Sequence, residues 1–251
     1  MNENQHVKLA ARLLELADDE LVLAHRNSEW CGHAPILEED IAFANLALDE
    51  LGHAILWYRL HAELSGQDPD STPDQLVYFR EPFEYRAAQF CALPKGDWAF
   101  SMLRQYLWDT LEDVRLEAFA GAALQSMAET AAKIRTEEVY HIRHTAAWVR
   151  RLGLGTDESN ARMQAALDLL WPYTGELTGG TAVEWGEYGL PPDSEIRADW
   201  EVRIREGLAE AGLTVPETAM LTLGRGLQSG YIVEILAELQ QVARLDPQAG
   251  W

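Results

Sequence analysis

The sequence predicts an all-α protein: an antiparallel four-helix bundle with additional C-terminal helices, formed by residues 1–251 as a single domain. Two observations support this class. Apolar residues recur every three to four positions over long segments, and no segment alternates with the period of two that is typical of strands. Two of the long segments also carry a Glu-x-x-His step on an apolar face. Such steps supply metal ligands in ferritin-like bundles, so the predicted bundle is ferritin-like.

Helix boundaries follow from turn and cap residues. Ser65 and Gly66 end the second helix, Gly153 and Gly155 end the fourth, and Thr156 or Asp157 caps the fifth. The Pro-rich residues 66–75 are expected to form a loop, and residues 174–192 an irregular segment. Asp193 or Ser194 is expected to cap the sixth long helix. In chain order, helices are predicted over residues 6–26, 37–64, 83–91, 98–127, 131–152, 157–172, 193–211 and 232–245.

The first Glu-x-x-His step is Glu50 and His53. Residues three apart share a helix face, so one turn offers a carboxylate beside an imidazole. Their neighbours on that face, Phe43 and Trp57 among them, are apolar. Glu20 interrupts a comparable apolar stripe in the first helix. A carboxylate on a core stripe is costly to bury unless it is paired, protonated or bound to metal.

The second step is Glu138 and His141. Glu137 lies four residues from His141 and competes with Glu138 for the same role. The helix before it offers Asp109 and Glu112, one turn apart, and the sequence leaves open which of the two faces the site. In a site that has lost its metal, the acids are expected to pair with one another, with Arg115 or Arg135, or with water.

Taken together, the ligand set predicted for iron or manganese is an acid, a Glu-x-x-His step, a second acid and a second Glu-x-x-His step, in that order. Its members are Glu20, Glu50, His53, Asp109 or Glu112, Glu138 and His141.

Composition narrows the function classes. The net charge is −21, and no basic stripe offsets it, which excludes nucleic acid and acidic membrane surfaces as partners. No apolar run reaches membrane-spanning length, and the first residues do not form a secretory signal. Two cysteines, Cys31 and Cys91, exclude a disulfide framework, so a cytoplasmic location is expected. Cys31 and His33 lie in one short turn, which is too little for a zinc site.

Four blocks of the chain, residues 28–54, 93–111, 140–177 and 246–251, resemble the C subunits of ring-1,2-phenylacetyl-CoA epoxidases. The most specific is SEWCGHAPILEEDIAFANLALDELGHA. The resemblance implies a ferritin-like subunit of a monooxygenase complex that epoxidises the aromatic ring of phenylacetyl-CoA in aerobic phenylacetate catabolism. It also implies a catalytic A subunit that holds the di-iron centre, a B subunit, and a flavin and iron–sulfur reductase. An isolated chain of this kind is expected to associate as a homodimer.

The resemblance further implies that a C subunit has lost metal ligands and serves a structural or regulatory role. This sequence departs from that pattern, because every ligand position is filled. Two functions therefore compete: a non-catalytic partner of the A subunit with a vestigial site, and an oxygenase subunit with its own di-iron or di-manganese site. Iron storage, a third class, normally uses a shorter bundle, and the helices beyond Leu152 count against it.

Overall fold

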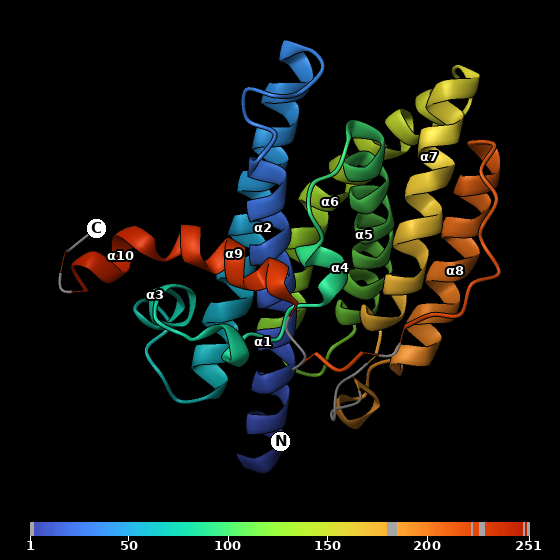
Figure 1. Ribbon diagram of the computed structural model, residues 1–251. Helices are drawn as coiled ribbons and strands as arrows, with labels where there is room; N and C mark the ends of the chain where they lie inside the picture. Colours follow the sequence, from blue (N-terminus) through green and yellow to red (C-terminus); the bar gives the residue numbers. More distant parts are fainter. Residues whose placement is uncertain (1–2, 180–184, 222, 226–228, 248, 250–251) are drawn as a thin grey trace. The chain divides into compact units, whose positions relative to one another are not determined.

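The computed structural model describes residues 3–179, 185–221, 223–225, 229–247 and 249. Every regular element within these ranges is helical, which confirms the predicted all-α, ferritin-like class (Figure 1). The chain divides into two compact units. Unit 1 combines Met1–Pro94 with Leu223–Trp251, and unit 2 is Lys95–Thr222. The predicted single domain stays a prediction.

Unit 1 is built on two long antiparallel helices, α1 (Glu3–Ser28) and α2 (Leu37–Leu64), which pack against each other along their lengths (Figure 1). The shorter α4 and α9 pack on α1, and α3 packs on α2. The remaining elements of this unit are α3 (Thr72–Tyr78), η1 (Pro82–Glu84), α4 (Gln89–Ala92), α9 (Gly230–Leu239) and α10 (Gln241–Leu245).

The ends of α2 follow directly from its sequence. Glu38, Glu39 and Asp40 occupy its first turn, where negative charge interacts favourably with the helix dipole. At its other end Gly66 has a φ of 68°, and its N–H donates to Glu63 O while the N–H of Gln67 donates to Ala62 O. These two bonds form a Schellman motif, which glycine favours because it adopts positive φ without strain. Both predicted boundaries of this helix are confirmed.

Unit 2 is organised around α5 (Trp98–Phe119), which α6, α7 and α8 all contact. Most α5 side chains are buried as a result, including polar ones. The Trp200 indole of α8 donates a hydrogen bond of 3.2 Å to Leu107 O of α5. The other elements are α6 (Gln125–Gly153), α7 (Asp157–Leu170), η2 (Trp171–Glu176), η3 (Trp185–Tyr188) and α8 (Asp193–Glu210).

Several predicted boundaries were wrong. The third long helix ends at Phe119 rather than Met127, because residues 120–124 turn and α6 already begins at Gln125. Part of the loop expected at residues 66–75 lies in α3, where Pro73 occupies a first-turn position that tolerates the missing N–H. Residues 83–91 do not form one helix, because extended backbone at Tyr85 separates η1 from α4.

The C-terminal helix is also divided, since α9 ends at Leu239 and α10 begins at Gln241. Of the two predicted caps of α7, Thr156 is confirmed. Its hydroxyl accepts a hydrogen bond of 3.1 Å from the Ser159 N–H. Neither Asp193 nor Ser194 caps α8. Pro192 takes the cap position in extended backbone, with its φ already fixed by the ring.

Candidate metal centre

Glu20, Glu50 and His53 come together in unit 1. Each offers a ligand atom, and these atoms all lie within 4.8 Å of one another. Glu20 comes from α1, whereas Glu50 and His53 stand one turn apart on the face of α2 that packs inward. The His53 Nδ1 and a Glu50 carboxylate oxygen are 4.0 Å apart. All three side chains are buried, at 1% exposure or less.

The chemistry of this group fits a metal ion. Carboxylate oxygens and imidazole nitrogens together suit iron and manganese, and the ligand atoms are close enough for one ion to reach all three. A divalent cation would also neutralise two carboxylates in a site where water cannot screen their charge. The described residues therefore contain a buried Glu/His group that could hold a metal ion.

The second Glu-x-x-His step forms on α6 in unit 2. Glu138 and His141 are fully buried, and the His141 Nδ1 lies 3.3 Å from a Glu138 carboxylate oxygen. Glu137 is exposed, so it cannot replace Glu138 as the buried carboxylate beside His141. The helical periodicity that selects Glu138 is set by Ile134 and His141, both of which are buried on the same stripe.

The acids of α5 are buried too, but they have partners within the protein. Asp109 accepts hydrogen bonds from Gln105 Nε2 at 2.5 Å and from Thr145 Oγ1 at 2.8 Å. Glu112 forms an ion pair with Arg115 in which both side chains are 1% exposed. Arg115 also donates to Leu177 O at 2.9 Å. The positive charge that neutralises Glu112 thus comes from Arg115, a side chain of the protein, rather than from a metal ion.

Arg135 does not reach the candidate acids. Its guanidinium lies 2.8 Å from Asp113 and 3.4 Å from Glu117, at the partly exposed edge of unit 2. Of the two arginines that the sequence offered as partners for a metal-free site, only Arg115 pairs with a candidate ligand.

The sequence interpretation missed the neighbours of Glu20. Asp18 is fully buried, and its carboxylate accepts from Arg80 at 2.5 and 3.1 Å and from the Tyr58 hydroxyl at 2.6 Å. The Arg86 N–H donates to it as well, at 2.7 Å. Burial, together with the Asp18 carboxylate, raises the pKa of Tyr58 well above its ordinary value, so the phenol remains a hydrogen-bond donor.

Asp19 is buried in the same way and joins other parts of unit 1 to α1. It accepts from the Ala88 N–H at 2.6 Å and from Arg225 at 2.6 Å. Asp18, Asp19 and Glu20 are thus three consecutive buried acids in the middle of one helix. The run of three acids in a mainly apolar segment was the available signal. Three successive residues of a helix point in different directions, so all three can be buried only if other parts of the chain cover α1 on several sides.

Neither cysteine forms a disulfide within the described residues; Cys31 is exposed and Cys91 is buried. His33 is exposed, and its Nδ1 contacts the Glu29 carbonyl at 3.2 Å. Neither Cys31 nor His33 joins a group of metal-ligating side chains within the described residues. No helix in that part of the chain is both long and apolar enough to cross a membrane.

Comparison with known proteins gives a family and a relative. A family model described as phenylacetic acid catabolic protein matches residues 1–251. The chain is also 35% identical, over 249 residues, to the C subunit of the 1,2-phenylacetyl-CoA epoxidase of Escherichia coli (strain K12). That alignment covers 97% of this chain and 99% of the relative. The chain therefore belongs to the phenylacetic acid catabolic protein family.

Proposed function

We propose that this chain is a structural or regulatory subunit of a multicomponent phenylacetyl-CoA 1,2-epoxidase, acting in aerobic phenylacetate catabolism in the cytoplasm. Its partners are a catalytic di-iron A subunit and a B subunit. The likeness to the C subunit of such an epoxidase, over nearly the whole of both chains, supports this assignment.

The observation that carries the non-catalytic role is the buried ion pair between Glu112 and Arg115. A two-metal carboxylate site of this class takes an acid from each helix of the bundle. In α5 one candidate acid is neutralised by Arg115, and the other, Asp109, accepts from Gln105 and Thr145. Both carboxylates thus satisfy their charge or hydrogen bonds without a metal ion.

Reconstitution tests this proposal. The purified chain with a reductase, but without the A subunit, is expected to form no epoxide from phenylacetyl-CoA above background. Supplying the A and B subunits should give activity, and omitting this chain from that mixture should lower it. Sustained epoxide formation without the A subunit would overturn the proposal.

The second candidate function is a metal-binding oxygenase subunit, which the Glu20, Glu50 and His53 group favours. Glu138 and His141 are the further candidate ligands from α6. Bound iron would supply oxygen activation, while the surrounding apolar side chains would exclude water from it. Within unit 1, the role of Glu20 and Glu50 would be to bind and neutralise the ion, and that of His53 to fix its position.

This candidate requires that iron(II) stabilise the native chain. At a hundredfold excess over the dissociation constant the gain would be about 2.7 kcal/mol. The melting temperature of the wild type should then rise with iron, that of His53→Ala should not, and that of the control His33→Ala, at an exposed histidine, should rise as in the wild type. Identical melting of the wild type with and without iron would remove the metal-binding candidate and leave the structural role in place.

A further inference from the structure

The C-terminal part of unit 1 is attached through little apolar surface. We call Arg225 together with α9 and α10 the C-terminal strap. In α9 the buried side chains are Ile232, Ile235 and Leu236, and in α10 only Ala243 is buried. By contrast, α2 has buried side chains along most of its length. A segment that buries few apolar side chains can open locally while the rest of its domain stays folded.

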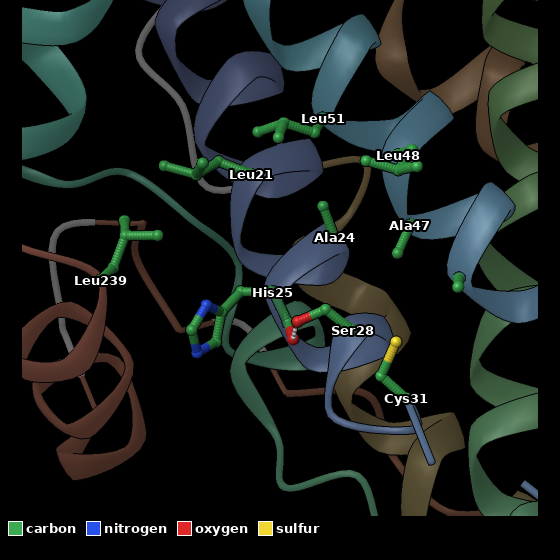
Figure 2. Close-up of a pocket in the computed structure, with 10 residues that line it drawn as sticks. Leu21, Ala24, His25, Ser28, Cys31, Ala47, Leu48, Leu51 and Leu239 are labelled. Carbon is green, nitrogen blue, oxygen red and sulfur yellow. Dashed lines mark hydrogen bonds between the residues drawn. The ribbon is translucent and has the colours of Figure 1, made fainter. Parts of the chain in front are cut away.

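Packing beneath α9 is incomplete. A cavity of about 360 Å³ lies where α9 meets α1 and α2 (Figure 2). Leu239 of α9 forms part of its wall, together with Leu21 and Ala24 of α1. A side chain that borders a cavity lacks the dispersion contacts that a closely packed interior supplies. Leu239 therefore contributes less to holding α9 in place than a fully packed leucine would.

The polar contact at the same place is also weak. The His25 Nε2 of α1 lies 3.8 Å from a carboxylate oxygen of Glu238 in α9, and the Glu238 side chain is 80% exposed. Burial lowers the pKa of His25, so the imidazole is mostly uncharged at neutral pH and the contact is not an ion pair. These contacts between α9 and α1 thus do not hold the C-terminal strap firmly.

The firm attachment is at Gln240, where α9 ends and α10 begins. This side chain is 4% exposed, and its Nε2 lies 2.9 Å from Val77 O, 3.0 Å from Arg80 O and 3.1 Å from the Tyr85 hydroxyl. Arg244 of α10 adds a hydrogen bond of 2.8 Å to the same Arg80 carbonyl. Buried hydrogen-bonding groups are costly to leave without partners, so Gln240 acts as the latch of the C-terminal strap.

The latch holds the residue that neutralises Asp18. Gln240 donates to the backbone carbonyl of Arg80, while the Arg80 guanidinium donates to both carboxylate oxygens of Asp18. Asp19, the next residue of α1, is neutralised by Arg225, which belongs to the C-terminal strap itself. The cations of two consecutive buried acids therefore depend on one weakly attached segment.

We propose that the C-terminal strap is a conformational lock on unit 1: it opens while α1 and α2 stay paired, Gln240 is its latch, and its opening exposes Asp18 and Asp19 to solvent. The proposal does not depend on the proposed function. The open form presents two carboxylates released from their arginines and an uncovered side of the cavity, neither of which the closed form offers. The C-terminal strap thus switches unit 1 between two different surfaces.

Carboxylate labelling measures the opening. A carbodiimide with an amine modifies carboxylates that solvent reaches, and mass spectrometry of peptides locates each product. In the wild type Asp18 and Asp19 are 0% exposed and should react slowly. Gln240→Leu keeps the approximate size of the side chain but removes the latch bonds. It should raise the labelling rate of both acids by about tenfold or more, because buried carbonyls lose their donor in the closed form.

The matched control is Gln241→Leu, the same replacement at the adjacent exposed position, which should leave both labelling rates unchanged. Labelling of Asp157, an exposed acid of α7, corrects for the activity of the reagent. Arg244→Met is a second variant at an exposed position. It removes the hydrogen bonds to Tyr78 O and Arg80 O, so it should raise the labelling rates in the same direction as Gln240→Leu.

Hydrogen exchange of the same proteins shows whether the C-terminal strap opens by itself. In the wild type the amides of α9 and α10 should exchange faster than those of α2, and low concentrations of urea should change their rates little, because a local opening exposes little surface. In Gln240→Leu the amides of α9 and α10 should exchange faster again, while those of α2 should keep the wild-type rates.

Three results would overturn the proposal. The first is exchange of α9 and α2 at one common rate with the same dependence on urea, which would mean that the C-terminal strap opens only when unit 1 unfolds. The second is faster exchange of α9 in Gln240→Leu without faster labelling of Asp18 and Asp19, which would mean that the C-terminal strap does not protect these acids. The third is equal labelling in Gln240→Leu and Gln241→Leu, which would remove Gln240 as the latch.

Discussion

Replacing Arg80 with Met is expected to lower the free energy of unfolding by roughly 3–5 kcal/mol, because the change leaves the Asp18 carboxylate buried without its cation. Asp18 is fully buried, and Arg80 holds it through two nitrogens. Burial alone would lower the pKa of Arg80, but the Asp18 carboxylate raises it above its ordinary value, so the guanidinium stays charged in the folded chain. The hydrogen bonds from Tyr58 and from the Arg86 N–H remain, but neither supplies positive charge.

Urea denaturation of the wild type and Arg80→Met would measure this loss. The matched control is Arg162→Met, which removes pairs with Glu158 and Asp97; the side chains of Arg162, Glu158 and Asp97 are 57%, 75% and 44% exposed. A pair that water already solvates should contribute less than about 1 kcal/mol. Similar losses in both variants would show that the buried pair contributes no more than the exposed one.

The second large effect is expected at Arg115. Arg115→Met should cost roughly 3–5 kcal/mol for the same reason, since it removes the cation that pairs with Glu112 in a site with 1% exposure. Leu177 O would also lose the hydrogen bond that Arg115 donates. Of the α5 acids, Glu112 should be more sensitive to loss of its partner than Asp109, which depends on neutral donors.

The companion variant Arg115→Met/Glu112→Leu should recover much of that loss, because replacing both members of a buried ion pair with apolar groups is often tolerated. Unfolding of the two variants by urea, without added metal, gives the comparison. Repeating the urea unfolding of Arg115→Met with manganese tests whether Glu112, once it has lost Arg115, binds a metal ion. A single variant as stable as the double variant would mean that Glu112 becomes protonated or solvated at no cost.

The part of the candidate site that the sequence predicted is the part defined within single helices. A spacing of three residues places Glu50 beside His53 and Glu138 beside His141, and an apolar stripe marks the buried face that each pair shares. The same reasoning placed Glu20 on the inner side of α1. The sequence left Glu137 as a competitor, and exposure in the structure removes it.

The rest depends on contacts between residues that are distant in the chain. The partner of Asp18 comes from a position 62 residues later, and that of Asp19 from one 206 residues later. No local period encodes such pairs. The division of residues 98–127 was missed for a different reason: four of the five residues at 120–124 are the good helix formers Ala and Leu, and they outweighed Gly121, the poor helix former at which the chain turns.

The discontinuity of unit 1 has a consequence for the order in which the chain can fold. Residues 95–222 are synthesised as one uninterrupted block, so unit 2 has all its helices while the chain is still growing. Unit 1 has to wait, because Asp19 in α1 receives Arg225 only after a further 206 residues have been translated. Until then an acid destined for the interior lacks its cation. The helices α1 and α2 are thus made before unit 2 but completed after it, and a chain truncated just before Arg225 would contain all of unit 2 together with an unfinished unit 1.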